Sequence, residues 1–409
     1  MRTIFKWVAR IIGLFILAIL AFALVLIVSG WSAFGKAPEG DRLARMEKSS
    51  HFSDGIFHNV RGQWVNYDAI YENGLFGDPV PEQNPSAPIP TAHPAQATLT
   101  TLPASGLRVT WFGHSSSLVE LDGVRVLTDP IWSERASPVQ WMGPQRWFQP
   151  LIPIADLPPI DAVVVSHDHY DHLDMATIKA LAAASSKTRF IVPLGVGAHL
   201  EYWGVAPSRI TEVEWWDEVP VGTIKIVSTP ARHATGRLAP SSNKVFWSGY
   251  VMIGPKHRAW YSGDTGYLPE FAEIGKRFAP FDVTLIESGQ YNPAWPDNHV
   301  GPEDAVRTNK LVGGKVLLPV HWALFSLAPH GWTEPVERVL AAAKCQRVTL
   351  ALPRPGQSVD FGEPLPTTKW WPDAPYHDAK TSPQQPTQNG NPKLRIPTAP
   401  CVRPSMSAS

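Results

Sequence analysis

One stretch of twelve residues constrains this chain more than any other, and it runs VVVSHDHYDHLD from Val163 to Asp174. The three valines predict a buried strand, because β-branched side chains favour that conformation. Three imidazoles and two carboxylates then follow within six residues. Such a run would be costly to bury without partners and unusual to leave idle. The pattern H-x-H-x-D-H therefore predicts a site for two metal ions.

The spacing within this stretch divides the ligands between two cations. Alternate side chains of an extended chain share a face, so His167 and His169 can bind one cation together. Asp171 and His172 project elsewhere as the chain turns into a helix predicted from Leu173, and they can reach a second cation about 3.5–4 Å away. The alternative is a polar loop with surface histidines. We favour the metal site, because neutral imidazole is the commonest metal ligand in proteins.

Three later segments each end a predicted strand at a metal-ligating side chain. The strands over 224–230, 260–262 and 315–320 lead to His233, Asp264 and His321. We expect His233 to be the third imidazole of the first cation and His321 to be the last ligand of the second. A carboxylate has two oxygens, so Asp264 can bridge both cations. Singly, each residue has an ordinary explanation in a turn or a half-buried histidine, but the recurrence of the pattern in order indicates one site.

Further segments resemble the metallo-β-lactamase-fold hydrolases, and within them the N-acyl-phosphatidylethanolamine-hydrolysing phospholipase D branch. They are VTWFGH (109–114), LTDPI (127–131), RASP (135–138), MGP (142–144), LPPIDAV (157–163), SHDHYDHLD (166–174), GDTGY (263–267), EIGKRFAPFD (273–282) and HVGPEDAVR (299–307). The resemblance covers residues 106–362. It implies an α/β fold, a four-layered αβ/βα sandwich with the metals at one edge between two sheets.

The resemblance also implies two zinc ions and a reaction. His167, His169 and His233 would hold one zinc, Asp171, His172 and His321 the other, and Asp264 would bridge them. Two cations that share a water lower its pKa from about 16 toward about 7, so a metal-bridging hydroxide is the expected nucleophile. Asp171 and Asp264 would be the catalytic residues, because they would bind the metals and orient that hydroxide. The implied substrate is N-acyl-phosphatidylethanolamine or a related phospholipid, hydrolysed as by a phospholipase D.

The segment 285–295 departs from this branch. Glu287 and Gln290 stand where the related phospholipase has smaller or apolar groups, and Ala294 stands in place of an arginine. This departure keeps open a metal-dependent lactonase or sugar-phosphate hydrolase. A third hypothesis is a non-catalytic metal-binding envelope protein, in which the cations only stabilise the fold.

Three residues outside the ligand set are candidates for substrate binding. His114 follows a predicted strand and precedes three serines, and the alternative is a loop histidine that satisfies backbone carbonyls. His299 precedes a predicted helix start at Pro302, so its alternative role is to support that start. Tyr291 lies in the segment that departs from the family and that we expect beside the metals.

The N-terminus predicts contact with a membrane. Residues 11–28 contain no charged side chain, and this stretch is long enough to span a bilayer. A cleaved signal peptide is the alternative, but its apolar core is normally shorter. We expect a single-pass anchor with the catalytic domain on the extracytoplasmic, periplasmic side, by analogy with signal anchors.

Composition places the remaining boundaries. We expect an anchor over 1–30, an N-terminal arm over 31–105 partly packed on the domain, a hydrolase domain over 106–365, and a disordered Pro-rich tail over 366–409. The 36 basic and 36 acidic residues form no basic stripe, so nucleic acid is not an expected partner. The expected partners are a phospholipid or another amphiphilic small molecule and the membrane itself. The sequence does not decide between a monomer and a homodimer.

Tryptophan is abundant, with 17 in the chain. Pairs at 215–216 and 370–371, with Trp132, Trp141 and Trp147, suggest a lipid-facing surface, because indole favours membrane interfaces. The alternative for each tryptophan is packing in the core.

Overall fold

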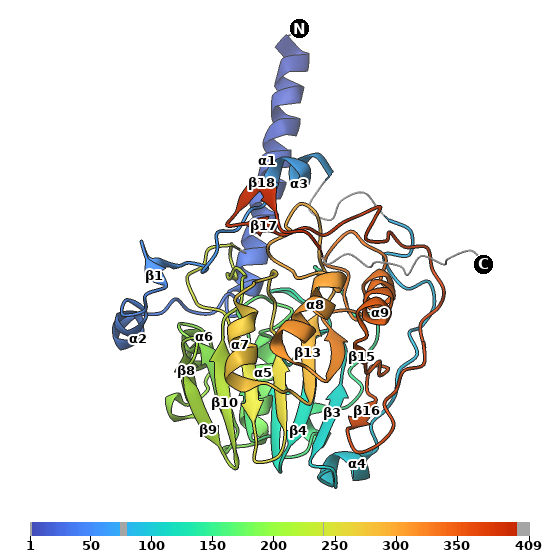
Figure 1. Ribbon diagram of the computed structural model, residues 1–409. Helices are drawn as coiled ribbons and strands as arrows, with labels where there is room; N and C mark the ends of the chain where they lie inside the picture. Colours follow the sequence, from blue (N-terminus) through green and yellow to red (C-terminus); the bar gives the residue numbers. More distant parts are fainter. Residues whose placement is uncertain (1, 74–79, 240, 399–409) are drawn as a thin grey trace, which may run out of the picture.

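Two seven-stranded β-sheets form the centre of the computed structural model, which describes residues 2–73, 80–239 and 241–398 (Figure 1). The first sheet has the order β16 (Ser358–Asp360), β3 (Leu107–Trp111), β4 (Ser117–Leu121), β5 (Val124–Thr128), β6 (Ala162–Val164), β7 (Arg189–Pro193) and β8 (Ile210–Val213). The second has the order β15 (Thr349–Leu350), β14 (Val316–Val320), β13 (Val283–Glu287), β12 (Arg258–Tyr261), β11 (Gly249–Ile253), β10 (Ile224–Thr229) and β9 (Glu218–Val221).

The strands bury both of their faces, as the valine run predicts. In β6, Ala162 and Val164 belong to the core between the two sheets, whereas Val163 belongs to the core on the outer side of the first sheet. In β4, Val119 and Leu118 divide in the same way. This is the two-residue period of a strand, and each such side chain contributes about 1.5–3 kcal/mol when it is fully buried.

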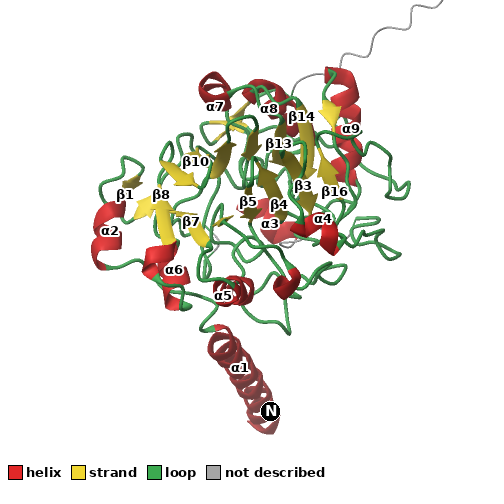
Figure 2. Ribbon diagram, turned by 90° about the horizontal axis from the view of Figure 1, so that it is seen from below, coloured by secondary structure: helices red, strands yellow, loops and turns green. Residues whose placement is uncertain are grey.

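Helices cover the outer faces of the two sheets, which gives four layers. Helices α5 (Met175–Ala184) and α6 (Gly197–Tyr202) supply Ile178 and Leu200 to the core outside the first sheet. Helices α7 (Phe271–Phe278), α8 (Pro302–Val312) and α9 (Glu334–Gln346) pack on the second sheet through residues such as Phe271 and Val339. Figure 2 shows the two helix groups on opposite sides of the strands. The predicted αβ/βα sandwich is confirmed.

Parallel pairing brings several strand ends to one edge of the sandwich. Strands β5 and β6 pair in parallel in the first sheet, and β12, β13 and β14 do so in the second. Parallel strands end at the same edge of a sheet, so the loops that follow them lie near one another. Every segment predicted to carry a metal ligand follows one of these strands or β10.

Helix α1 (Arg2–Gly30) projects from the body of the molecule (Figure 1). Its segment 4–30 is long and apolar enough to cross a membrane, and none of its most apolar window is buried in the protein. This helix is therefore a candidate transmembrane anchor, although a signal sequence has the same properties.

The segment after α1 runs over the surface of the sandwich and reaches both of its ends (Figure 1). It contains α2 (Gly40–Met46), β1 (Phe52–Ser53), β2 (Ile56–Phe57), α3 (Tyr67–Asn73) and α4 (Gln96–Thr100). Met46 and Phe57 are buried in one cluster with Trp215 and Phe246. The arm is thus partly integrated into the domain.

Up to residue 398 the tail has a defined structure, whereas we expected it to be disordered. It forms a hairpin of β17 (Thr387–Gln388) and β18 (Asn391–Arg395), and Thr387 is fully buried. Trp371 is 3% exposed and packs on Trp322 at 5.6 Å between ring centroids. Low hydrophobicity predicts disorder, but two tryptophans and a few buried hydrogen bonds are enough to fix this segment. Residues 399–409 lie outside the described part of the chain.

Most tryptophans of the suggested lipid-facing surface lie in the core. Trp215 and Trp371 are buried, and Trp147, Trp216 and Trp370 pack against the central cluster. Trp141 is the exception, since 49% of it is exposed.

Candidate metal centre

The first predicted ligand group converges at the edge where β6 and β10 end. The His167 Nε2 atom lies 2.9 Å from His169 Nδ1, and His233 Nε2 lies 3.3 Å from the same Nδ1 atom. These three donor atoms belong to a group compact enough to hold one cation. Long-range folding therefore places His233 where the strand pattern predicts it.

The second predicted group lies beside the first. The His172 Nε2 atom is 3.1 Å from Asp171 Oδ2 and 3.2 Å from His321 Nε2. The His321 Nε2 atom is 3.4 Å from the same Asp171 oxygen. Two imidazole nitrogens that face each other this closely cannot both carry a proton, and a cation between them would satisfy both.

Asp264 lies between the two groups. Its Oδ2 atom is 3.0 Å from His172 Nε2 and 3.1 Å from His321 Nε2, and it is 3.9 Å and 3.8 Å from the Nε2 atoms of His167 and His233. Its Oδ1 atom is buried and has no hydrogen-bond partner among the described residues. A buried, unpartnered carboxylate oxygen is costly unless a cation binds it. The donor set and its geometry fit metal ions of the kind bound by imidazole and carboxylate.

Local backbone geometry fixes two of these ligands. Gly263 has φ +60°, and a Cβ atom there would lie 2.6 Å from Ser166 Cβ, so only glycine fits before Asp264. His321 has φ 68°, a strained value for a non-glycine residue. Backbone hydrogen bonds hold it, because the His321 amide donates to His114 O at 2.9 Å and the His114 amide donates to Trp322 O at 3.0 Å.

Asp129 is a functional residue that the sequence interpretation missed. It follows β5, is fully buried, and its Oδ2 atom accepts hydrogen bonds from His172 Nδ1 at 2.6 Å and from the Tyr261 hydroxyl at 2.5 Å. A carboxylate on the far nitrogen of a ligand histidine fixes its tautomer and orientation. The signal was present, because Asp129 repeats the pattern of a strand followed by a metal-ligating type of residue.

Glu287, at the end of β13, supports the other side of the centre. Its Oε2 atom lies 2.7 Å from His299 Nδ1 and 3.4 Å from His321 Nδ1, and its Oε1 atom accepts from the Thr265 amide at 2.7 Å. Burial raises the pKa of Glu287 above its ordinary value. Glu287 therefore orients histidines and does not face an open substrate space.

The charges of the centre suit cations. Burial alone would raise the pKa of Asp171 and Asp264, but nearby imidazoles, His172 first among them, hold both pKa values well below the usual range. Burial lowers the pKa of His167 well below its ordinary value, so this ring is neutral, the form that binds metals. Burial acts the same way on His321, but Asp264 and Asp171 raise its pKa to about 10. A cation would compete with that proton for the same nitrogen.

The three predicted substrate-binding residues have different surroundings. His114 is fully buried, and its Nε2–H donates to Asp171 Oδ2 at 2.9 Å. Burial and the neighbouring His321 lower the pKa of His114 to about 3, so the ring is neutral. The ring is therefore enclosed beside Asp171 and has no exposed surface.

His299 lies at the centre itself. Its ring is 5.2 Å from that of His233 and 5.1 Å from that of His321, and 14% of its side chain is exposed. It is therefore close to both ligand groups and accessible. The alternative, in which His299 only supports the start of α8, does not account for this placement.

Tyr291 differs from its expected position. It is 2% exposed, its hydroxyl donates to Glu334 Oε1 at 2.7 Å, and its ring stacks on His330 at 4.7 Å. The hydroxyl is thus hydrogen-bonded inside the protein, because Glu334 on α9 accepts its hydrogen bond.

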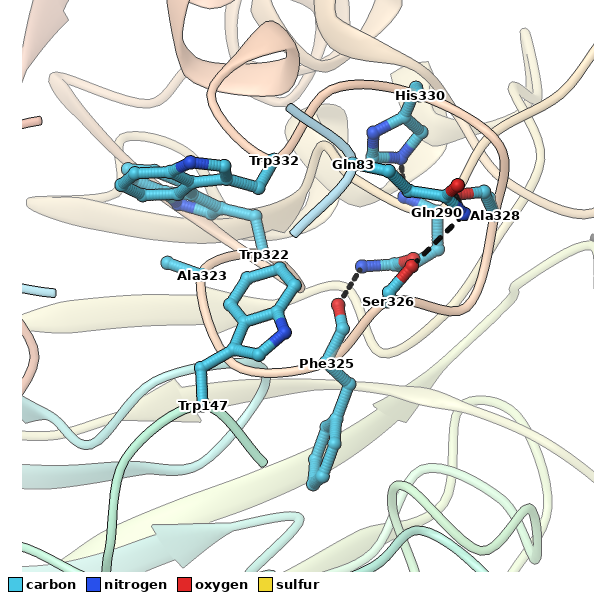
Figure 3. Close-up of a pocket in the computed structure, with 10 residues that line it drawn as sticks. All are labelled: Gln83, Trp147, Gln290, Trp322, Ala323, Phe325, Ser326, Ala328, His330 and Trp332. Carbon is cyan, nitrogen blue, oxygen red and sulfur yellow. Dashed lines mark hydrogen bonds between the residues drawn. The ribbon is translucent and has the colours of Figure 1, made fainter. Parts of the chain in front are cut away.

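Gln290 also makes its hydrogen bonds inside the protein. Its side-chain amide donates to Phe325 O at 3.1 Å and accepts from the Leu327 amide at 2.9 Å. Its backbone amide donates to His330 Nε2 at 2.8 Å (Figure 3). With φ 60°, Gln290 closes a loop. The departure from the phospholipase pattern in this segment therefore adjusts internal contacts.

Both ends of the chain contribute to the position of His233. The Asn59 side chain in the arm donates to His233 O at 2.8 Å and accepts from the His233 amide at 3.0 Å. The neighbouring Arg232 is fully buried and pairs with Asp297 at 2.9 Å, and Asp297 accepts from Thr387 in the tail. The arm and the tail thus support the metal centre.

Comparison with known proteins defines the class. The model of the beta-lactamase superfamily domain matches residues 124–322. An uncharacterized protein of Mycobacterium tuberculosis is 51% identical over 290 residues, which cover 70% of this chain and 77% of that protein. N-acyl-phosphatidylethanolamine-hydrolyzing phospholipase D 1 of Caenorhabditis elegans is 38% identical over 240 residues, which cover 56% of this chain and 67% of that enzyme. A solved metallo hydrolase from Ignicoccus hospitalis has 22% identity and a TM-score of 0.47, and the match covers 62% of this chain and 97% of that one.

The chain therefore belongs to the metallo-β-lactamase superfamily, and it is a metal-dependent hydrolase of that superfamily. The candidate metal-binding residues lie at the ends of strands of both sheets.

Proposed function

We propose that this protein is a two-zinc phosphodiesterase that hydrolyses N-acyl-phosphatidylethanolamine or a related phospholipid in the manner of a phospholipase D. The observation that carries the proposal is the position of Asp264, whose Oδ2 atom lies within 3.9 Å of a ring nitrogen in each histidine group. The 38% identity to the nematode enzyme supports the choice of substrate.

Seven side chains would hold the two zinc ions in this proposal. His167, His169 and His233 form the first site, Asp171, His172 and His321 form the second, and Asp264 bridges them. Bound zinc would ionise water near neutral pH and stabilise negative charge that develops on phosphate oxygens.

The protein groups around the metals have separate roles. Asp171 and Asp264 also orient the attacking water by accepting its hydrogen bonds. His114 holds Asp171 in place, and Asp129 and Glu287 fix the tautomers of His172 and His321. His299 is the residue we assign to contact with the substrate, because it is accessible and next to both sites.

An amphiphilic substrate agrees with the candidate anchor. Helix α1 would hold the enzyme at the bilayer, with the catalytic domain on the extracytoplasmic side. A lactonase or sugar-phosphate hydrolase has less support, since Glu287 and Gln290, the residues that favoured it, are buried in internal contacts. A purely structural role for the metals leaves the accessible His299 beside both ligand groups without a purpose.

The test is a substrate screen with the full chain in detergent, after the metal has been removed and zinc restored. N-acyl-phosphatidylethanolamine, a soluble phosphodiester and a lactone are compared, with Asp264→Asn as the inactive variant. Glu218→Gln, which removes an exposed carboxylate on β9, is the matched control. We expect zinc-dependent release of phosphatidic acid from the phospholipid, retained in the control and lost in Asp264→Asn. Turnover of the lactone alone, or no zinc-dependent turnover of any substrate, would refute the proposal.

A further inference from the structure

A hairpin over 135–145 packs along the last turns of α1. The ring of Trp141 meets that of Phe22 edge-on, with 5.9 Å between centroids and 80° between planes. Gly30 is buried against the same hairpin, because a Cβ atom there would lie 3.2 Å from Pro138 Cβ. The hairpin thus lies beside a helix that is a candidate to cross a membrane.

The position of Trp141 along α1 sets its depth. Phe22 precedes Gly30 by two helical turns, which at 1.5 Å per residue is about 12 Å along the axis. The hydrocarbon core of a bilayer is about 30 Å thick, and the apolar stretch of α1 ends at Val28. If α1 spans the bilayer, a ring level with Phe22 lies below the headgroups of the leaflet on the enzyme's side. This holds for either orientation of the helix.

The hairpin satisfies two of its own backbone carbonyls. The Arg135 side chain donates to Gly143 O at 2.7 Å, to Gln140 O at 3.2 Å and to Gln145 Oε1 at 2.9 Å. Backbone carbonyls that are satisfied inside the hairpin need no water. The tip itself exposes 49% of Trp141 and 38% of Met142, and indole favours the membrane interface.

The foot of α1 is clamped to the loop that carries the metal ligands. The Trp203 indole donates to Ser32 O at 2.7 Å, and Arg237 Nε donates to Ala33 O at 2.6 Å. The same guanidinium donates through Nη1 to Asp168 O at 2.7 Å, between His167 and His169. One buried side chain therefore joins the end of the helix to the metal centre. The next residue, Leu238, is 76% exposed.

We propose that the tip of this hairpin, Trp141 and Met142, inserts into the phospholipid leaflet beside α1 and forms a membrane-docking surface. With the Arg237 clamp, it fixes the metal centre at a set height above the bilayer. The inference rests on the insertion of α1 assumed in the proposed function, and it does not depend on which substrate is hydrolysed.

The experiment measures depth in vesicles. The full chain, with Cys345 and Cys401 replaced by serine, carries an environment-sensitive fluorophore at Trp141→Cys and is reconstituted in phosphatidylcholine vesicles with nitroxide-labelled lipids. Leu17→Cys in α1 is the control for insertion. Leu102→Cys, an exposed residue just after α4 at the opposite end of the molecule (Figure 1), is the control for water. Met142→Cys reports on the same tip if the first substitution prevents folding.

We expect a blue shift at position 141 and loss of its fluorescence mainly to nitroxides near the headgroups. Position 17 should be quenched by nitroxides near the bilayer centre, and position 102 by neither. Quenching at 17 with a water-exposed signal at both 141 and 142 would overturn the docking surface. Absence of quenching at 17 would overturn it by removing the anchor. Neither result involves turnover, so the hydrolase proposal stands or fails separately.

Discussion

Replacement of Asp129 by Asn should weaken zinc binding while every predicted ligand stays in place. The Oδ2 atom of Asp129 accepts from His172 Nδ1, from the Tyr261 hydroxyl and from Ser166 Oγ. An amide NH₂ group in that position accepts none of these hydrogen bonds, and an amide oxygen there would leave the Ser166 amide without its acceptor. In the first orientation the His172 ring loses the partner that fixes its tautomer, and in the second the segment that begins the HDHYDH run loses a backbone hydrogen bond.

The size of the effect follows from the number of histidines that lose their support. Removal of one carboxylate behind a metal-bound histidine costs about 10- to 100-fold in metal affinity. That is about 1.4–2.7 kcal/mol of binding free energy. His172, in the second group, bonds to Asp129 directly through its ring, whereas His167, in the first group, is linked to Asp129 only through the Ser166 hydroxyl. The loss should therefore be larger in the binding step of the second group than in that of the first.

The assay is competition for zinc with a chromophoric chelator, run on the full chain in detergent. Glu120→Gln is the control, because Glu120 is an equally buried carboxylate on β4 that pairs with Arg108 and Arg125 and touches no imidazole. We expect this control to lose stability but to keep both zinc affinities. If Asp129→Asn keeps both affinities, or if Glu120→Gln weakens zinc to the same extent, the argument for orientation by Asp129 is wrong.

Two further substitutions test buried groups outside the ligand set, Asp304 on α8 and Tyr291. Burial raises the pKa of Asp304 to about 7, so its proton is retained in the fold when the unfolded chain has lost it, and stability falls as pH rises from about 4 to 7. Asp304→Asn should remove up to about 4 kcal/mol of this loss of stability. The measurement compares the free energy of urea unfolding of the variant and the parent at pH 4, 5.5 and 8. The same difference between the two proteins at all three pH values would contradict the prediction. Tyr291→Phe should cost about 1–3 kcal/mol of stability through its bond to Glu334 and leave KM unchanged, whereas a raised KM with unchanged stability would return Tyr291 to the substrate site.

The convergence of the candidate ligands could be predicted because its signal is local. Each ligand follows a recognisable strand, and parallel strands end at the same edge of a sheet, so the pattern alone brings His233, Asp264 and His321 toward the HDHYDH run. The fold class followed from the family resemblance and the two-residue alternation. Both depend on residues that are close in sequence or on a topology the family shares.

The supporting residues could not be predicted, because their roles exist only in the folded chain. Asp129 contacts His172 across 43 positions, and Asp297 contacts Thr387 across 90. No sequence pattern distinguishes a tyrosine hydroxyl that is hydrogen-bonded inside the protein, as in Tyr291, from one that is free to bind a substrate. Trp141 could not be separated from Trp371 either, since both occur in segments rich in polar residues and glycine or proline, and only packing decides which of them is exposed.

The zinc content of the purified full chain tests the central claim most directly. Elemental analysis after zinc loading and dialysis should find two zinc ions per chain in the parent and in Glu218→Gln. His321→Ala removes a ligand of the second group only, and it should retain one. One zinc or none in the parent, or two in both His233→Ala and His321→Ala, would contradict a centre built from these seven side chains.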